Sequence, residues 1–278
     1  MEEAFQEDPR EKPEHHGRQE ESNQVYQVIH VGACRSGKAD GEGVECVYSQ
    51  NGKSLCTDRR DNGKDRRKTV KYIIMCGGKY GDTPKQLLTV MGERIAERTI
   101  RLLRAYGVKD IAISSNDPRF EGLGVPVLKH ENNFEYGKNT HSWLKAFYPT
   151  SVPTCYIFGD VYFSEDAIKT IVRINTDTIQ FFASAPPFAE NYIKIWAEPF
   201  AFKVNKPSLF FHRIEECHKY DLEGKFHREA VSWELWQVIK GTKLDVIDYT
   251  NYIAINDYTC DIDDEKEARE FERKVFGA

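Results

Sequence analysis

The chain has 278 residues, enough for one large domain or two modest ones. Its 39 Lys and Arg against 44 Asp and Glu give a net charge of -5, which argues against nucleic acid as a partner because a basic footprint is missing. No apolar run approaches the roughly 20 residues of a membrane-spanning helix, and the charged N-terminus lacks a signal peptide's apolar core. We therefore expect a cytoplasmic protein without membrane insertion.

Residues 1–69 contain only eight Leu, Ile, Val or Phe, too few to offset the entropy of ordering so long a segment. The composition predicts a mostly disordered extension, followed by one domain over 70–278. A second interpretation is that DRRKTV encodes a ribosome-binding site and a start codon. In that case the native protein begins at Val70.

From residue 70 onward, short apolar runs alternate with helical patterns. In chain order they predict strand 71–76, helix 93–108, strand 110–117, strand 124–130, helix 139–148, strand 154–163, helix 164–174 and strand 178–185. Strands that alternate with helices at this spacing predict an α/β fold with a mostly parallel sheet covered on both faces. Ligands of such sheets bind at the carboxyl ends of the strands.

The first strand runs into a glycine-rich turn, KYIIMCGGKYGDTPKQLL, which begins at Lys71. A dinucleotide fingerprint needs a glycine where Cys76 stands, and a P-loop needs glycine rather than Pro84 before its lysine. The dinucleotide fingerprint and the P-loop are therefore both disfavoured.

Cys76 itself is either an apolar residue at a strand end, which we favour, or a catalytic thiol.

What remains is a compact turn that suits a triphosphate. Glycines let backbone N–H groups turn toward phosphates, and lysines at the edges add positive charge. Pro84 fixes its own backbone and so presents Lys85 rigidly. The predicted nucleotide-binding residues of the turn are Gly77, Gly78, Lys79 and Gly81, with Lys85 as a catalytic residue.

The stretch from Ile73 to Ile113 resembles the opening of the nucleotidyltransferases of the molybdopterin-guanylyltransferase, methylerythritol-cytidylyltransferase and sugar-phosphate type. The resemblance covers about residues 70–278 in layout. It implies a Rossmann-like three-layer sandwich of the glycosyltransferase-A-like nucleotide-diphospho-sugar transferase type. It also implies Mg²⁺-dependent transfer of NMP from an NTP to a phosphorylated acceptor, with release of pyrophosphate, often in cell-envelope polysaccharide biosynthesis. The turn departs from the family because it is shorter and lacks the arginine that usually precedes Pro-Lys.

Two acidic strand ends complete the expected site. Asp160 ends the strand YIFGD, where the family holds its magnesium, and the family typically closes with a D-I-D like that of Asp261 and Asp263. In a strand those two aspartates point to the same side, so one or both could face Asp160. Mg²⁺ prefers one or two carboxylates with phosphate oxygens. We expect Asp160, Asp261 and Asp263 as metal ligands and Asp160 and Asp263 as catalytic residues. The alternative is that Asp263 or Asp264 only caps the last helix.

The remaining expected contacts are with the base and the acceptor. The resemblance places Asn139 and Ser142 near the nucleotide base, although both also suit an ordinary helix start. Residues 186–256 are expected to line the acceptor pocket, and their layout is similar to that of phosphocholine cytidylyltransferases. This slightly favours CTP and leaves a sugar 1-phosphate or a phosphocholine-like acceptor open. The expected acceptor-binding residues are Lys194, Lys203 and Trp233. Trp233 could form a cation–π wall for a quaternary amine together with Trp196, Trp236, Tyr249 and Tyr252. The alternative is that these aromatic residues are part of the core.

Two other classes compete with this interpretation, and a homo-oligomer is compatible with all three. A glycosyltransferase of related fold would use a nucleotide-sugar, but its D-x-D normally ends a central strand, where this chain has Gly-Asp-Val. A non-catalytic nucleotide-binding or scaffold protein on the same fold is supported by the missing arginine.

Overall fold

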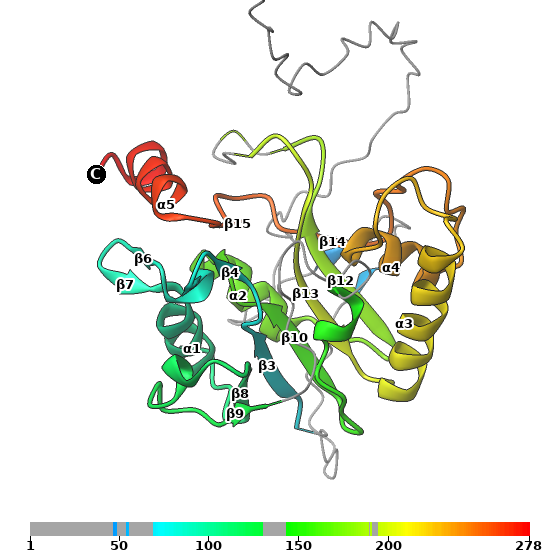
Figure 1. The fold of residues 1–278 in the computed structure, drawn as a ribbon, viewed down its shortest axis with the longest axis horizontal. Coiled ribbons are helices and arrows are strands. Elements are labelled where there is room, and N and C mark those ends of the chain that lie inside the picture. The colour runs from blue at the N-terminus through cyan, green and yellow to red at the C-terminus, as the bar shows by residue number, and fades with distance from the viewer. Residues whose placement is uncertain (1–46, 49–53, 56–68, 130–142, 189, 191–193) are drawn as a thin grey trace, which may run out of the picture. The chain divides into compact units, whose positions relative to one another are not determined.

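The computed structural model describes residues 47–48, 54–55, 69–129, 143–188, 190 and 194–278 (Figure 1). The chain divides into two units, Met1–Cys56 and Thr57–Ala278. In the first unit, β1 (Val47–Tyr48) and β2 (Ser54–Leu55) pair antiparallel. The expectation of disorder falls mostly on residues 1–68 outside the described ranges and stays a prediction, as does the start at Val70.

The second unit is built on a seven-stranded sheet of order β14-β12-β13-β10-β3-β8-β9. In chain order its strands are β3 (Lys71–Met75), β8 (Ile111–Ser114), β9 (Val127–Leu128), β10 (Thr154–Phe158), β12 (Ile179–Ser184), β13 (Glu198–Val204) and β14 (Ile253–Ala254). Only β13 runs antiparallel to its neighbours, β10 and β12, and every other pairing in this sheet is parallel. The predicted α/β fold with a mostly parallel sheet is confirmed.

Helices cover both faces of this sheet and make three layers (Figure 1). On β13, Phe202 points to one face, where its ring packs with Phe210 of α3 (Pro207–Leu222) and Trp236 of α4 (Ser232–Lys240). The next residue, Lys203, points to the other face, where its Nζ donates to the last carbonyls of α2 (Glu165–Arg173). Side chains alternate across a strand, so these contacts assign the helices to opposite faces.

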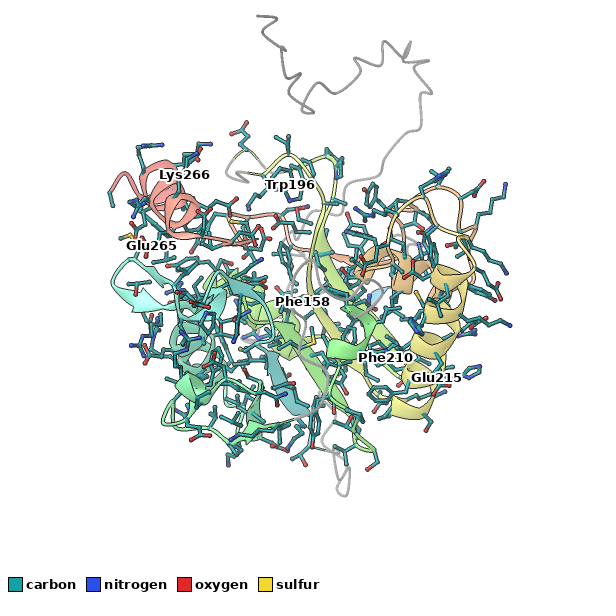
Figure 2. The ribbon with its side chains drawn as sticks, viewed as in Figure 1. Phe158, Trp196, Phe210, Glu215, Glu265 and Lys266 are labelled. Carbon is teal, nitrogen blue, oxygen red and sulfur yellow. The ribbon has the colours of Figure 1, made fainter. Side chains whose placement is uncertain are left out.

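The amphipathic pattern of each helix faces the sheet. In α1 (Ile95–Ala105), which lies within the predicted helix 93–108, the residues at apolar spacing face the sheet. Ile95, Thr99, Leu102 and Leu103 are buried, and Tyr106 just after the helix is half-buried. On α3, Phe210 is buried whereas Glu215 lies on the exposed side (Figure 2). The predicted N-cap Ser164 accepts a hydrogen bond of 2.9 Å from the backbone N–H of Ala167 at the start of α2.

Several predicted boundaries were wrong. The helix expected over 139–148 is a 3₁₀ turn, η3 (Trp143–Ala146), within its described part. Residues 225–241 also have a helical pattern in the sequence, but the helix begins only at Ser232, and α3 was not predicted. The apolar residues of α3 do not form a clear stripe along one face, so the sequence shows no amphipathic pattern there. The helix is instead packed against the sheet by Phe210, whose ring contacts Tyr156 of β10 and Phe202 of β13.

Three short antiparallel pairs lie outside this sheet. Two are hairpins, β4 (Lys79–Tyr80) with β5 (Thr83–Pro84) and β6 (Thr89–Val90) with β7 (Glu93–Arg94). The third joins two segments far apart in the sequence, β11 (Val161–Tyr162) and β15 (Cys260–Asp261). The chain then ends in α5 (Glu265–Phe271) and a π-helical turn (Glu272–Phe276). Two 3₁₀ turns, η1 (Lys85–Leu87) and η2 (Pro118–Phe120), follow β5 and β8.

The ends of β3 and β10 approach each other so closely that one residue between them must lack a side chain. The N–H of Gly159 donates to the carbonyl of Met75 at 3.0 Å. A Cβ at position 159 would lie 2.4 Å from that carbonyl oxygen and 2.9 Å from Cys76 Sγ. Glycine at 159 therefore lets the strand end bring Asp160 up against the glycine-rich turn.

Gly159→Ala is expected to lower the free energy of unfolding by about 3 kcal/mol or more, because the backbone carbonyl of Met75 cannot move aside. Urea unfolding measures this. Gly78→Ala is the matched control, because its Cβ would meet no atom closer than 3.5 Å. Equal stability of the two variants would contradict the prediction.

Candidate active site

The β11–β15 ladder brings the two acidic segments together. Val161 pairs with Asp261, and the N–H of Ile262 donates to the carbonyl of Asp160 at 2.9 Å. The acidic strand ends that the sequence predicted as neighbours therefore lie side by side, because the register of this pairing aligns them.

Lys85 lies among these carboxylates. Its Nζ is 2.5 Å from Asp263 Oδ1, and both side chains are only partly exposed, at 21% and 39%. Lys85 directly follows Pro84, which is buried and extended, so the lysine leaves the hairpin in a fixed direction.

The glycine-rich turn forms the hairpin β4–β5 beside this lysine. Gly81 has a φ of +55°, which favours glycine at the hairpin tip. A Cβ at Gly78 would lie 3.8 Å from Asp160 Oδ2 and 3.8 Å from Lys85 Cδ. The turn, the lysine and the first carboxylate therefore border one another, as the sequence predicted.

The charges of this group shift each other's pKa values. Burial alone would lower the pKa of Lys85, but Asp160, Asp263 and Asp261 outweigh it and raise the pKa, so the lysine stays charged. Burial raises the pKa of Asp160 to about 6; Lys85 opposes this rise, whereas Asp261 and Asp263 add to it. The site holds more negative charge than Lys85 balances.

The two roles proposed for the terminal acids fall on different residues. Asp264 caps α5, since its carboxylate accepts a 2.8 Å hydrogen bond from the N–H of Glu267. Asp263 faces Lys85 instead. The capping alternative therefore applies to Asp264 and leaves Asp263 for the site.

Asp261 faces a second, more buried cluster. Lys194 Nζ lies 2.9 Å from Asp261 Oδ1, 2.9 Å from Glu267 Oε2 and 3.9 Å from Glu198 Oε1. Burial would lower the pKa of Lys194, but Asp261, Glu267 and Glu198 raise it. Burial and the neighbouring Asp261 raise the pKa of Glu198 well above its usual value.

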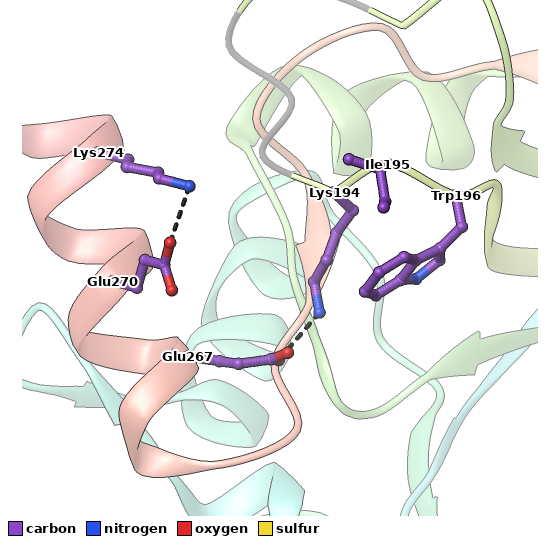
Figure 3. A pocket seen from close by; sticks show the side chains of 6 residues that line it. All are labelled: Lys194, Ile195, Trp196, Glu267, Glu270 and Lys274. Carbon is purple, nitrogen blue, oxygen red and sulfur yellow. Dashed lines mark hydrogen bonds and ion pairs between the residues drawn. The ribbon is translucent and has the colours of Figure 1, made fainter. Parts of the chain in front are cut away.

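A hollow of about 210 Å³ opens beside this cluster (Figure 3). Lys194 points from its wall toward Glu267 of α5, and the ring of Trp196 lies next to the lysine, with Nζ 5.2 Å from the ring centroid. The other lining residues are Ile195, Glu270 and Lys274. Of the predicted acceptor residues, Lys194 reaches a hollow near the site.

The other two predicted acceptor residues lie elsewhere, and for these the expectation is corrected. Lys203 is buried, and its ammonium group donates hydrogen bonds of 2.6–3.0 Å to the carbonyls of Ile171, Val172 and Ile174. It pairs with Cys155 near the start of β10, the end of the sheet opposite Asp160. Trp233 is 2% exposed, and its ring packs edge-on against Phe181 in the core.

Asn139 and Ser142 lie outside the described residues, so their expected contacts with the base remain predictions. Cys76 is buried, and burial, aided by Asp160, raises the pKa of its thiol, so the catalytic alternative loses its basis.

The sequence missed a pair of residues after β8 that contact the hairpin. Arg119 donates to both carboxylate oxygens of Asp117 and to the carbonyl of Asp82. Asp117 Oδ2 also lies 3.3 Å from Lys79 Nζ. The signal in the sequence was the polar run SSNDPR at a strand end.

The donor set fits a hard divalent cation of low protein coordination. No three His, Cys, Asp or Glu side chains within the described ranges form a ready-made metal cage. Mg²⁺, however, usually takes one or two carboxylates and completes its shell with water and phosphate. Asp160 and Asp263 offer such carboxylates. Asp263 and Asp261 each pair with a lysine through Oδ1, but Asp263 is the more exposed of the two, at 39% against 26%.

No family model and no curated protein matches the chain. Its fold is similar to that of many solved structures, among them the following three. CTP:phosphocholine cytidylyltransferase from Streptococcus pneumoniae is 17% identical over 74% of this chain and 98% of that chain, with a TM-score of 0.43. The 4-diphosphocytidyl-2C-methyl-D-erythritol synthase from Anaerococcus prevotii is 13% identical over 75% and 96%, with a TM-score of 0.47. HddC from Yersinia pseudotuberculosis, complexed with GMP-PN, is 15% identical over 74% and 99%, with a TM-score of 0.43.

Likeness at these identities concerns the fold alone. At such identities and TM-scores the likeness adds no step to the case for function, which rests on the geometry of the site. No helix within the described ranges is long and apolar enough to cross a membrane.

The raised pKa of Asp160 predicts a pH-dependent stability. An unfolded aspartate has a pKa of about 3.9, so between that value and about 6 the folded state binds more protons, and stability falls as the pH rises. Asp160→Asn never ionises. We expect it to be about 1–2 kcal/mol more stable than the wild type at pH 7, with the difference vanishing toward pH 4.

Urea unfolding between pH 4 and pH 7, in the presence of a chelator, measures this difference. Asp177→Asn, at an exposed position, is the control and should follow the wild-type profile. A pH-independent effect of Asp160→Asn would show that its ionisation is not linked to folding.

Lys194→Met is expected to cost about 3 kcal/mol of stability, because Asp261 and Glu267 lose their shared cation in a buried setting. Adding Glu267→Gln to that variant should recover part of the loss. The control is Lys274→Met, which breaks the exposed pair with Glu270 in the same hollow and should cost less than about 0.5 kcal/mol. Equal losses in thermal or urea unfolding would contradict the assigned role.

Proposed function

We propose that the chain is a Mg²⁺-dependent nucleotidyltransferase that moves NMP from an NTP to a phosphorylated acceptor and releases pyrophosphate. One observation carries this proposal. Lys85, at the end of a glycine-rich hairpin, lies 2.5 Å from Asp263 and beside Asp160, which supports a site where a triphosphate and a divalent cation would meet.

The reaction needs positioning and charge neutralisation more than a protein nucleophile. A phosphate oxygen of the acceptor attacks the α-phosphorus of the NTP and forms a new P–O bond. The bond from the α-phosphorus to the bridging oxygen breaks, and its electron pair leaves with pyrophosphate. Lys85 stays protonated and neutralises the negative charge that develops on the phosphates.

Asp160 and Asp263 would hold the metal. When bound, Mg²⁺ supplies charge neutralisation and orients the phosphates. Asp261 acts one step away, because its pairing with Lys194 fixes β15 and so the position of Asp263.

The nucleotide would lie along the glycine hairpin. The backbone of Gly77, Gly78 and Gly81 and the side chain of Lys79 would face the triphosphate. Asn139 and Ser142 are retained as proposed base contacts, and CTP is slightly favoured on the sequence resemblance.

We place the acceptor in the hollow beside α5, where Lys194 and Trp196 line a wall next to Asp261. A sugar 1-phosphate and a phosphocholine-like molecule both suit the proposal. Lys203 and Trp233 are not part of it.

The test incubates the full chain with Mg²⁺, each NTP and a panel of phosphorylated acceptors, and measures pyrophosphate. Lys85→Met and Asp263→Asn are each expected to lower kcat roughly 100- to 1,000-fold, the usual cost of losing one preorganised group that stabilises charge. Lys71→Met is the control, because its ion pair with Asp110 lies at the start of β3, the far end from the site.

Two outcomes would overturn the proposal. Turnover of a nucleotide-sugar without pyrophosphate would assign a glycosyltransferase. Nucleotide binding without turnover for every acceptor would assign a binding or scaffold protein.

A further inference from the structure

The hairpin β4–β5 is too small to hold its own shape. Each strand has two residues, Lys79 pairs with Pro84, and Pro84 has no N–H to donate to the ladder. Isolated two-stranded hairpins are marginal in water even when they are longer. Something outside the hairpin must fix the position of the proposed phosphate-binding backbone.

The segment after β8 supplies that support through a forked contact. Arg119 Nε donates to Asp117 Oδ1 at 2.9 Å, and Nη2 donates to Asp117 Oδ2 at 2.6 Å. The same Nη2 also donates to the carbonyl of Asp82 at 2.6 Å. The guanidinium therefore joins the hairpin tip to the end of a central strand.

Asp117 is the anchor of this arrangement. It is 8% exposed, its Oδ1 accepts from the N–H of Arg119, and its own N–H donates to Ser115 Oγ. Its Oδ2 also lies 3.3 Å from Lys79 Nζ, at the base of the hairpin. Hydrogen bonds from Arg119 hold the pKa of Asp117 well below its usual range, so the anchor stays ionised.

The pair thus holds the hairpin at two places, the base through Lys79 and the tip through the carbonyl of Asp82. Arginine suits this task because its planar fork meets a carboxylate and a carbonyl at once, whereas lysine is a single mobile charge. The short turn has no arginine of its own.

We propose that Arg119 is a positioning residue for the nucleoside triphosphate, holding the hairpin 79–84 from the end of β8 in place of an arginine within the turn. This inference rests on the proposed function for its kinetic consequence, but the structural part stands independently. Arg119 acts through the hairpin backbone and Lys79, and it touches no reacting atom.

The kinetic test compares Arg119→Ala with Arg101→Ala. Arg101 makes an equivalent fork on Glu93, at 2.8 and 2.7 Å, and is similarly exposed, at 51% against 46%. Arg119→Ala should raise the KM for the NTP roughly 10- to 100-fold, as the loss of one or two charge-assisted hydrogen bonds implies, and change the acceptor KM less than about twofold. Arg101→Ala should change neither.

Arg119→Lys separates the fork from the charge. Because a lysine cannot bridge Asp117 and the Asp82 carbonyl in the same way, this variant should resemble Arg119→Ala. Wild-type kinetics in Arg119→Lys would overturn the positioning role and assign Arg119 a charge effect alone. Equal rises in both KM values would assign it a merely structural role and also overturn the proposal.

Hydrogen exchange of the nucleotide-free full chain tests the inference without any activity. Backbone amides of 79–83 should exchange faster in Arg119→Ala than in the wild type or Arg101→Ala, whereas those of β10 should keep their wild-type rates in all three. Unchanged exchange in the hairpin would overturn the inference even if the enzyme is active. If β10 also exchanged faster in Arg119→Ala, Arg119→Lys would replace it, with the same expected change confined to the hairpin. A wild type that releases no pyrophosphate would instead count against the proposed function and leave this exchange result as the deciding one.

Discussion

The candidate site depends on an imbalance of charge around one lysine. Lys85 contacts Asp263 directly and interacts electrostatically with Asp160 and Asp261, which keeps the lysine protonated. Burial, together with Asp261 and Asp263, raises the pKa of Asp160 to about 6. Such a cluster is costly in a folded chain unless a further cation reduces the repulsion. The geometry that creates it comes from two backbone features, the β11–β15 ladder and the close approach at Gly159.

The two lysines near the acids have different capacities for a ligand. Lys194 is 5% exposed and surrounded by three carboxyl groups, so its charge is already satisfied and it acts mainly on the structure around it. Lys85 is 21% exposed and has one direct carboxylate partner, which an incoming phosphate can exchange for. The two lysines thus differ in their capacity to bind a phosphate because they are buried to different extents.

The sequence predicted those parts of the site that depend on local pattern. Asp160 follows an apolar strand, Asp261 and Asp263 follow period two, and Lys85 follows a proline, so their places could be inferred from neighbours in the chain. Arg119 and Glu198 could not be inferred, because their contacts depend on which strands become neighbours. Lys203 was misplaced for the same reason. Since β13 runs antiparallel to β10, its late residues lie at the opposite end of the sheet from Asp160, and no local pattern reveals that reversal.

The pairing of Lys85 with Asp263 joins residues 178 positions apart. During synthesis, Lys85 therefore lacks this partner until another 178 residues have been made. The β3 strand, the hairpin and β10 can assemble earlier, but Asp160 and Lys85 then face each other without β15 beside them. A contact of this range closes late in folding because loop-closure entropy must be met first. The acidic cluster around Lys85 is therefore complete only when β15 has paired with β11.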